Sequence, residues 1–380
     1  MAASGAGRPA VRLIVPGNVL HNSGGNAYNA ELARGLTDLG VDVRICRIEG
    51  NWPVGSEEER RRLAVLLLDG GDDGGSTGSA TAVPPVTIVD GLVALGAPRA
   101  LEEAAAAGRP AWILVHMQLA EYPDLEGRAL AAAAGAICAS STAASELRAR
   151  HSPLRHDSAG VSQTPIHVAL PGTSAAPAAA GSNPPHFLAV AALLPNKDQL
   201  LLLNALAGIR DLPWTASLVG SDAADPAYAE AVRSAITGLG LGDRVSVEGE
   251  LRGQALDAEW ARADLSLLIS QAETYGMVVT ESLARGIPVV VRDGTGAVEA
   301  LAAGSPGTAE AADGGGAPAL PGAAVVLGTD PAPLERALRR WLSTPELRLR
   351  WREAALAARN RLPGWDVTAG TVLDFIAAAG

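Results

Sequence analysis

Two glutamates on either side of a glycine mark the stretch whose residue types are suited to binding a sugar or a nucleotide. In QAETYGMVVTESLARGIPVVV, residues 271–291, Glu273 and Glu281 are separated by seven residues. Vicinal hydroxyls donate well to ionised carboxylates, so the pair could hold a sugar and a ribose. A helix that opens at Gly276 would also present unpaired backbone N–H groups to a phosphate, from Tyr275, Gly276 and Met277.

The same two glutamates also have a purely structural interpretation. Glu273 would then be a charge partner for the helix start, and Glu281 a solvated or capping residue. A chain with 41 acidic residues contains several such pairs by chance. Glu281, however, lies within MVVTESLA, where a buried face would not tolerate an unpaired carboxylate. The context of strand, loop and Gly-opened helix therefore favours ligand binding.

A single lysine, Lys197, stands in LLPNKDQLLLLNAL among 30 basic residues that are otherwise arginine. One interpretation is compositional, because a GC-rich genome favours Arg codons and one lysine can survive by chance. The other is functional, because a compact ammonium on a flexible stem can follow a phosphate where a rigid guanidinium cannot.

Composition excludes several classes of protein. The net charge of −11 argues against a nucleic-acid partner. No apolar signal region or membrane-spanning run is present, and Cys46 and Cys138 lie in apolar strand-like runs. We therefore expect a soluble, cytoplasmic protein without a disulfide, metal or transmembrane segment. The Arg-rich stretches 57–68 and 146–156 leave a peripheral membrane contact open. The Asp pairs of the low-complexity segment 69–82 resemble a metal-binding DxD only superficially.

Short apolar runs alternate with helical patterns along the whole chain of 380 residues, a length that suggests two domains. This alternation predicts parallel sheets covered on both faces, in two doubly wound α/β domains in tandem. The predicted strands are residues 11–16, 41–48, 85–91, 111–116, 135–140 and 165–170, then 186–192, 214–220, 244–249, 265–270, 287–291 and 323–327. The predicted first-half helices include residues 26–40, 99–108 and 141–151.

The segment 171–185 is rich in Pro, Gly, Ser and Ala and lacks any period, which is typical of a hinge or linker. It divides an N-terminal domain, residues 1–170, from a C-terminal domain, residues 186–364. Because ligands bind at the carboxyl ends of strands in such sheets, we expect the site in an interdomain cleft. Residues 311–322 form a second low-complexity segment and are expected to be a surface loop.

The stretch 270–290 resembles the donor-site motif of the retaining glycosyltransferases of family 4, in an actinobacterial-type version. Those enzymes have the GT-B fold, two Rossmann-like domains facing across a cleft. Further similarities follow in the family's order: SGGNAYNAELARGLTDLGVDV (23–43), LVHMQL (114–119), LPGT (170–173), LLPNKDQLLLLNAL (193–206) and DGTGAVEAL (293–301). Residues 365–380 resemble the family's last helix, which crosses back to the N-terminal domain, with Trp365 as a packing anchor.

The resemblance implies three catalytic residues: Glu273 on the sugar hydroxyls, Lys197 on the distal phosphate, and His116 at the sugar's 6-position or the nearby backbone. Glu281 would hold the nucleotide ribose. The other donor-binding residues implied are Gly24, Gly25, Tyr275, Gly276 and Met277. Gly220 and residues 249–251 are candidate walls for the base, with ordinary strand-end turns as the alternative.

The reaction implied is a metal-independent hexosyl transfer from a nucleotide-diphosphate sugar, UDP- or GDP-linked, to an acceptor hydroxyl. Attack and departure would occur on the same face of the sugar, with retention and without a bound cofactor. The chain departs from the family at Ala192, where an Arg is usual five residues before the Lys. Neutralisation of the diphosphate would then depend on Lys197, the helix start and the Gly24–Gly25 loop, unless another Arg has moved in.

Two alternatives remain open from the sequence. A GT-B epimerase or phosphorylase would use a similar cleft, and a dinucleotide-binding oxidoreductase or non-catalytic nucleotide-binding protein would use a similar fold. The oxidoreductase and the non-catalytic nucleotide-binding protein are disfavoured because the segment PGNVLHNSGGNAYN lacks the Gly-x-Gly-x-x-Gly pattern. Acceptors are expected on loops 17–26, 49–56 and 117–124. The nucleotide, the sugar, the acceptor and the oligomeric state stay open.

Overall fold

A computed structural model describes residues 10–18, 23–69, 85–151, 164–305 and 320–378. The chain divides into two compact units, unit 1 with Met1–Gly172 and Trp365–Gly380, and unit 2 with Thr173–Gly364. The low-complexity segments 69–82 and 311–322 lie largely outside the described residues, as do parts of loop 17–26 and of the Arg-rich stretch 146–156.

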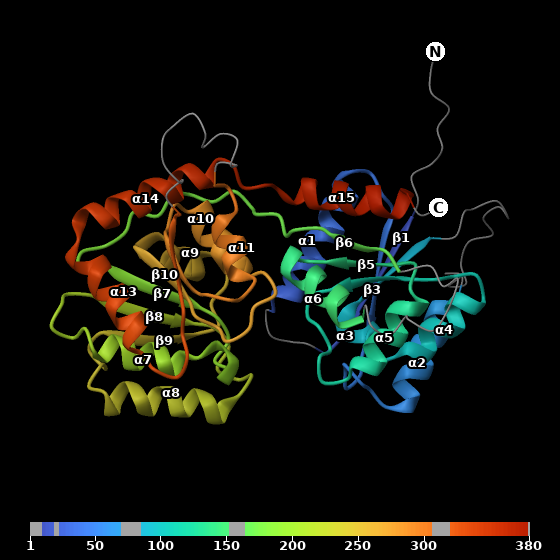
Figure 1. The fold of residues 1–380 in the computed structure, drawn as a ribbon, viewed down its shortest axis with the longest axis horizontal. Helices are drawn as coiled ribbons and strands as arrows, with labels where there is room; N and C mark the ends of the chain where they lie inside the picture. The colour runs from blue at the N-terminus through green and yellow to red at the C-terminus, as the bar shows by residue number, and fades with distance from the viewer. Residues whose placement is uncertain (1–9, 19–22, 70–84, 152–163, 306–319, 379–380) are drawn as a thin grey trace, which may run out of the picture. The chain divides into compact units, whose positions relative to one another are not determined.

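Unit 1 contains, in its described part, a six-stranded parallel sheet in the order β2-β1-β3-β4-β5-β6. Its strands are β1 (Val11–Pro16), β2 (Val43–Ile48), β3 (Val86–Asp90), β4 (Trp112–Val115), β5 (Gly135–Cys138) and β6 (Ile166–Val168). Its helices are α1 (Gly24–Asp38), α2 (Glu57–Leu68), α3 (Gly91–Ala94), α4 (Pro98–Ala106), α5 (Pro123–Ala132), α6 (Ser141–His151) and α15 (Trp365–Ala378). Figure 1 shows these helices flanking the sheet.

Unit 2 repeats the pattern, with a six-stranded parallel sheet in the order β12-β11-β10-β7-β8-β9 in the part described. Its strands are β7 (His186–Val190), β8 (Thr215–Val219), β9 (Val245–Gly249), β10 (Leu265–Leu268), β11 (Val289–Arg292) and β12 (Gly322–Val325). Its helices are η2 (Pro195–Lys197), α7 (Gln199–Ala207), α8 (Pro226–Gly238), α9 (Gln254–Arg262), α10 (Met277–Ala284), α11 (Ala297–Ala302), α13 (Ala332–Ser343) and α14 (Pro345–Arg359).

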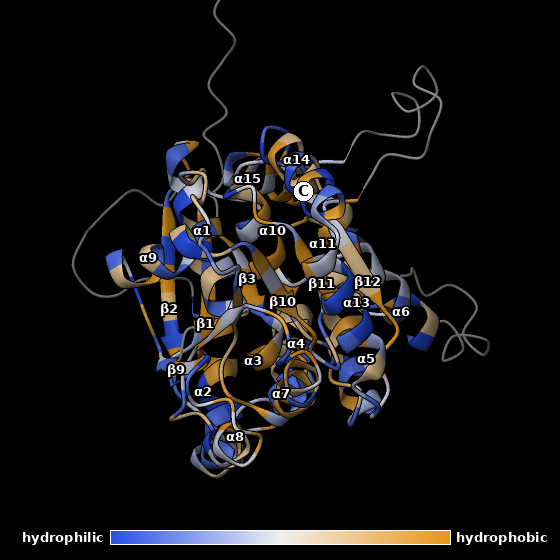
Figure 2. Cartoon of the chain, turned by 90° about the vertical axis from the view of Figure 1, so that its left-hand side faces the viewer, coloured by the Kyte–Doolittle hydropathy of each residue, from blue (hydrophilic) through white to orange (hydrophobic). Residues whose placement is uncertain are grey.

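Each predicted strand is present in the structure. Helices cover both faces of each sheet, so its strands are nearly continuous apolar runs that can be recognised in the sequence. The central strands β4 and β10 are buried at every residue, whereas the edge strand β2 is exposed at several positions. Helices such as α14 carry hydrophobic and hydrophilic residues together (Figure 2). The sequence periodicity therefore reports the burial of each element.

The C-terminal helix α15 packs on α1 within unit 1. A Cβ added at Gly35 of α1 would lie 2.9 Å from the Cβ of Ala369, so the two helices approach closely. Trp365 is buried and packs edge-to-face on Tyr28, with ring centroids 5.3 Å apart. Trp365 thus anchors the end of the chain to unit 1.

The Pro- and Gly-rich segment before β7 is bound to unit 2 along much of its length. Ala179 N–H donates to the Arg285 carbonyl at 2.9 Å, and Ala180 N–H donates to the Ala261 carbonyl at 2.9 Å. The Arg359 guanidinium also donates to the Ala176 carbonyl at 2.7 Å. A segment with no sequence period is therefore held largely by its backbone groups, with Ala179 also packed in a hydrophobic cluster that includes Trp260 and Ile287.

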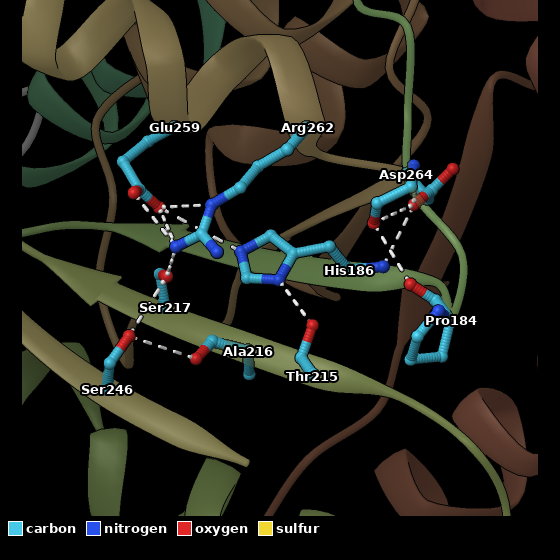
Figure 3. Close-up of polar contacts among 10 residues, drawn as sticks. Pro184, His186, Thr215, Ala216, Ser217, Ser246, Glu259, Arg262 and Asp264 are labelled. Carbon is cyan, nitrogen blue, oxygen red and sulfur yellow. Dashed lines mark hydrogen bonds and ion pairs between the residues drawn. The ribbon is translucent and has the colours of Figure 1, made fainter.

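A buried polar cluster joins the amino ends of β7 and β8 to α9 (Figure 3). His186 Nδ1 lies 2.7 Å from the Thr215 hydroxyl, and the imidazole lies between Thr215 and the Glu259–Arg262 ion pair. His186 Nε2 is buried and has no hydrogen-bond partner, with Glu259 Oε2 at 3.9 Å. Burial, followed by the nearby Arg262 charge, lowers the pKa of His186 to about 4, although Glu248 acts in the opposite direction.

This cluster predicts an acid-sensitive unit 2. The folded-state pKa of His186 lies below its ordinary value of 6.5, so the unfolded chain binds more protons between these values. Stability is therefore lost as the pH falls from about 6.5 towards 4, by on the order of 3 kcal/mol for the full shift. His186→Gln should reduce the difference in melting temperature between pH 7 and pH 5. Parallel losses in the two proteins would exclude His186 as the cause.

Candidate functional site

The loop after β7 brings Lys197 to the carboxyl end of the unit 2 sheet. It forms the short helix η2, and then Asp198 takes a left-handed conformation with φ 58°. Asp tolerates this conformation better than most residues. The Asn196 carbonyl accepts from Gln271 N–H at 2.8 Å, which joins this loop to the one after β10. Neighbouring strands therefore place the two loops together.

Lys197 and Glu273 form an ion pair across these two loops. Lys197 Nζ lies 2.6 Å from Glu273 Oε1, and their side chains are 22% and 14% exposed. The pair is thus partly shielded from water yet accessible at one side. An anionic ligand would compete with Glu273 for the ammonium, and a hydroxyl would find a carboxylate already held in place.

Helix α10 begins beside Glu273 with no side chain capping it. Gly276 is the N-cap residue, with φ 84°, and the first turn contains no acidic residue. A residue with a Cβ would be strained there, and that Cβ would lie 2.9 Å from Leu268 Cδ2. Met277 opens the helix, and Tyr275 is buried, which raises the pKa of its hydroxyl. The helix start therefore leaves its first backbone amides without a side-chain acceptor.

Two glycines let backbone segments meet around this site. Gly296 N–H donates to the Glu273 carbonyl at 2.8 Å, and a Cβ on Gly296 would lie 1.9 Å from the Thr274 carbonyl oxygen. A Cβ on Gly220 would lie 2.0 Å from the Ala191 carbonyl oxygen. Side chains are excluded at both positions. Gly220 therefore fits the interpretation of an ordinary strand-end turn.

Ala192 occupies the position where the family resemblance led us to expect an arginine. Its carbonyl accepts from Gln199 Nε2 at 2.9 Å. Arg292 comes to the same region and pairs with Asp198, next to Lys197. Its other N–H groups donate to the Ile269 carbonyl at 2.9 Å and the Leu327 carbonyl at 2.7 Å. Arg292 is thus neutralised inside unit 2 by Asp198, whereas Lys197 is paired with Glu273, which is itself a candidate site residue.

Glu281 lies one turn further along α10 and is partly buried. Burial raises the pKa of its carboxyl, although the charge of Arg285 acts in the opposite direction. Within the described part of the chain its carboxylate makes no hydrogen bond, while Arg285 donates to the Glu281 backbone carbonyl at 3.0 Å. A desolvated carboxylate without donors is well suited to accept hydrogen bonds from a ligand.

His116 lies at the end of β4 in unit 1, within a buried polar network. Its Nε2 is 2.9 Å from Asn29 Oδ1 and 3.6 Å from Asp90 Oδ2. Asn29 Nδ2 donates to Asp90 Oδ2 at 2.5 Å, and Asp90 Oδ1 accepts from Leu92 N–H at 2.8 Å. Burial lowers the pKa of His116, and the charge of Asp90 opposes this.

Sequence reasoning singled out His116 but missed Asn29 and Asp90. The available signal was that Asp90 ends a strand, since β3 and β4 are neighbours in the sheet and end at the same edge. Asn29 is separated from Asp90 by 61 residues and gave no local signal.

Gly24 and Gly25 open α1, which Ser23 caps by accepting from Asn26 N–H at 3.2 Å. Among the described residues, a Cβ added at Gly24 would meet nothing within 4 Å, whereas one at Gly25 would lie 3.2 Å from His116 Cδ2. Gly25 therefore lets the helix start approach the imidazole.

The described residues form neither a cluster of metal-binding side chains nor a membrane-spanning helix. Within them no group of three or more His, Cys, Asp or Glu side chains is arranged to hold a metal ion. No helix in the same residues combines the length and apolar character needed to cross a bilayer.

Comparison with known proteins bears directly on unit 2. Residues 174–357 match the family model of the glycosyl transferases, group 1. The match covers just under half of the chain and includes Lys197, Gly220, Glu273 and Glu281.

Curated relatives align over the same part of the chain. The D-inositol 3-phosphate glycosyltransferase of Thermomonospora curvata is 32% identical over 181 residues, which are 47% of this chain and 38% of that protein. The protein of the same name from Streptomyces coelicolor is 30% identical over 196 residues, 49% of this chain and 38% of its own length. The alignments therefore span less than half the length of these relatives.

Solved structures are similar over nearly the whole chain. A sucrose-phosphate synthase from Thermosynechococcus elongatus has a TM-score of 0.72 at 18% identity, covering 98% of this chain and 100% of that one. Anabaena Alr3699/HepE in complex with UDP and glucose has a TM-score of 0.66 at 16% identity, covering 97% and 99%. With the two parallel sheets and their flanking helices, these similarities confirm the predicted two-domain α/β GT-B fold.

We expect the Glu281 carboxylate, which makes no hydrogen bond among the described residues, to lower the stability of unit 2. The folded-state pKa of Glu281 is raised, so ionisation is less favourable in the folded protein than in the unfolded chain and destabilises the fold at pH 7. Glu281→Gln should therefore raise the melting temperature at pH 7. The gain should shrink as the pH falls and the wild-type carboxyl is protonated.

The control for this prediction is Glu353→Gln, which removes an exposed carboxylate from α14. This variant should melt close to the wild type at each pH. A Glu281→Gln protein that melts at or below the wild-type temperature at pH 7 would contradict the prediction.

Proposed function

We propose that this protein is a retaining glycosyltransferase that moves a hexosyl group from a nucleotide-diphosphate sugar to an acceptor hydroxyl. The observation that carries the proposal is the Lys197–Glu273 pair beside the uncapped start of α10. An ammonium, free amides and a carboxylate then meet at one sheet edge, which suits a diphosphate joined to a sugar. The group 1 match over the same residues supports this assignment.

In this proposal unit 2 binds the donor. Lys197 and the backbone amides at Tyr275, Gly276 and Met277 take the diphosphate, and Glu273 accepts hydrogen bonds from the sugar hydroxyls. Glu281 accepts from the ribose diol, for which its desolvated carboxylate is prepared. Arg292 and Asp198 neutralise each other nearby, so Lys197 provides the cation for the leaving diphosphate.

The chemical step we propose needs neither a metal nor a bound cofactor. The bond from the anomeric carbon to the phosphate oxygen breaks while the bond to the acceptor oxygen forms on the same face of the sugar. The acceptor proton passes to the departing phosphate oxygen, which Lys197 and the helix start stabilise as its charge develops. His116 and the Gly24–Gly25 helix start of unit 1 contact the sugar and the phosphate.

A uridine nucleotide is the first donor to test, because Alr3699/HepE, which has a similar fold, was solved with UDP and glucose. The acceptor class is a separate matter. The curated relatives are named for D-inositol 3-phosphate, but their alignments cover 47% and 49% of this chain. A screen of polyol and glycan acceptors should therefore follow identification of the donor.

Lys197→Ala should weaken binding of the cognate nucleotide diphosphate by at least about tenfold, or about 1.4 kcal/mol. The reason is loss of the cation on the distal phosphate. Calorimetry with UDP, GDP, ADP and TDP and their sugar conjugates measures this on the wild type and the variant. Arg99→Ala, which removes an exposed guanidinium paired with Glu103 on α4, is the matched control and should bind as the wild type does. Equal binding by the Lys197 variant would refute the assigned role.

Glu273→Gln should affect the binding of the sugar differently from the binding of the diphosphate. The variant loses the carboxylate that holds Lys197 at 2.6 Å, so the nucleotide diphosphate should bind as well as or better than it does to the wild type. The nucleotide-sugar should lose about tenfold in affinity relative to the diphosphate alone, since its hydroxyls lose a charged acceptor. If both ligands weakened equally, Glu273 would act on the phosphate site rather than on the sugar.

A further inference from the structure

The buried network in unit 1 contains a carboxylate, an amide and an imidazole in series, from three different elements. Asp90 ends β3, Asn29 lies inside α1, and His116 follows β4. Asp90 and Asn29 are 3% and 4% exposed. Their contacts form a chain, with Asn29 Nδ2 at 2.5 Å from Asp90 Oδ2 and Asn29 Oδ1 at 2.9 Å from His116 Nε2.

The direction of each hydrogen bond follows from the chemistry of the groups. An ionised carboxylate can only accept, so the Asn29 amide must point its NH₂ group at Asp90. Its carbonyl oxygen then faces the imidazole and can only accept as well. His116 Nε2 must therefore carry the proton, and in the neutral ring Nδ1 is left with a lone pair. Asp90 is itself oriented, because its other oxygen accepts from Leu92 N–H at 2.8 Å.

The ring is held on its other sides by groups that do not compete for Nδ1. Tyr28 packs edge-to-face on it with ring centroids 5.0 Å apart, and its hydroxyl donates to the Ala169 carbonyl at 2.9 Å. Gly25 lets the start of α1 approach the imidazole, since a Cβ there would lie 3.2 Å from Cδ2. In the described residues His116 Nδ1 has no hydrogen-bond partner and is not among the fully buried polar atoms that lack one.

We propose that Asn29 and Asp90 are positioning residues that lock His116 in the tautomer protonated at Nε2, so that Nδ1 accepts a hydrogen bond from a substrate hydroxyl. The tautomer rests on the geometry of unit 1, and the substrate hydroxyl rests on the proposed transferase function. Asp90 Oδ2 also lies 3.6 Å from Nε2, but burial has the larger effect on the ring and favours a neutral imidazole that works as an acceptor rather than as a cation. A hydroxyl suits this acceptor, whereas a carboxylate or phosphate oxygen has no proton to donate.

Exchanging the carboxylate of Asp90 and the amide of Asn29 tests the relay, by which we mean the hydrogen-bonded series Asp90–Asn29–His116. In Asp90→Asn the new side chain keeps its oxygen on Leu92 N–H and turns its NH₂ towards Asn29, which must then present its own NH₂ to His116. The proton should move to Nδ1. The double variant Asn29→Asp with Asp90→Asn puts an acceptor next to Nε2 again and should return the proton there. Both changes preserve side-chain size.

The first readout is the ¹⁵N spectrum of the full chain labelled at histidine, which separates the two ring nitrogens of the 6 histidines. The His116 signals are assigned by their loss in His116→Gln. Above pH 8 the wild type should show a protonated Nε2, Asp90→Asn a protonated Nδ1, and the double variant a protonated Nε2. A wild-type proton on Nδ1, or an Asp90→Asn protein with its proton still on Nε2, overturns the relay.

The second readout is kcat/KM with the donor found in the nucleotide screen. Asp90→Asn should lose roughly tenfold, about 1.4 kcal/mol, and the double variant should recover most of it. Asp38→Asn makes the same chemical change at an exposed position of α1 and should leave kcat/KM unchanged. A double variant with the restored tautomer but no recovered activity would overturn the substrate contact. If no donor supported activity, the transferase proposal would be contradicted. The ¹⁵N spectra would still show whether the relay sets the His116 tautomer.

The pH profile gives a third readout that a purely structural role would not move. The titratable residues that contact His116 in the described part of the chain are Asp90, whose carboxylate ends β3, and Tyr28 of α1, whose ring packs on the imidazole and whose hydroxyl pKa burial raises. Burial lowers the pKa of His116, so activity should fall only below its ordinary range. The double variant places a carboxylate against Nε2, and its acid limb should move to higher pH. An unmoved acid limb would contradict the role of His116.

Discussion

Parallel strands that are buried on both faces leave polar side chains few places to act except the strand ends, and this constraint organises both units. The central strands β4 and β10 are buried at every residue. Lys197 and Glu273 follow β7 and β10, which are neighbours, and Asp90 and His116 follow or end β3 and β4, which are also neighbours. Each unit therefore brings together groups that are far apart in the sequence because their strands end at the same edge.

Backbone approach holds the unit 2 loops in place and leaves the side chains available. Gly296 binds the Glu273 carbonyl, and Gly220 lies against the Ala191 carbonyl at a distance that no Cβ would allow. Gly276 lets the chain turn into α10 without a capping side chain. Hydrogen bonds that would otherwise occupy functional groups are thus made by main-chain atoms, and the Glu273 carboxylate remains paired with Lys197 alone among the contacts described.

The charges near each candidate site are distributed unevenly, and the distribution suits binding rather than stability. Arg292 is buried and paired with Asp198, whereas Lys197 is paired with Glu273, a candidate ligand-binding residue. Among the described residues the Glu281 carboxylate makes no hydrogen bond, and burial raises its pKa. Burial lowers the pKa of His116, although Asp90 Oδ2 lies 3.6 Å from Nε2 and its charge opposes this. Groups left in unfavourable states in the free protein are those that a ligand would stabilise.

The alternation of apolar runs was enough to predict the twelve strands that the described residues contain and the α/β class, because burial on both faces of a sheet produces continuous hydrophobic runs in the sequence. The type and spacing of Lys197, Glu273 and Glu281 predict a phosphate and sugar site, and that assignment stays a prediction. Periodicity carries no information about pairing between distant residues. Only the tertiary structure showed that Asn29 stands between Asp90 and His116, because that contact depends on strand order and helix packing rather than on any local pattern.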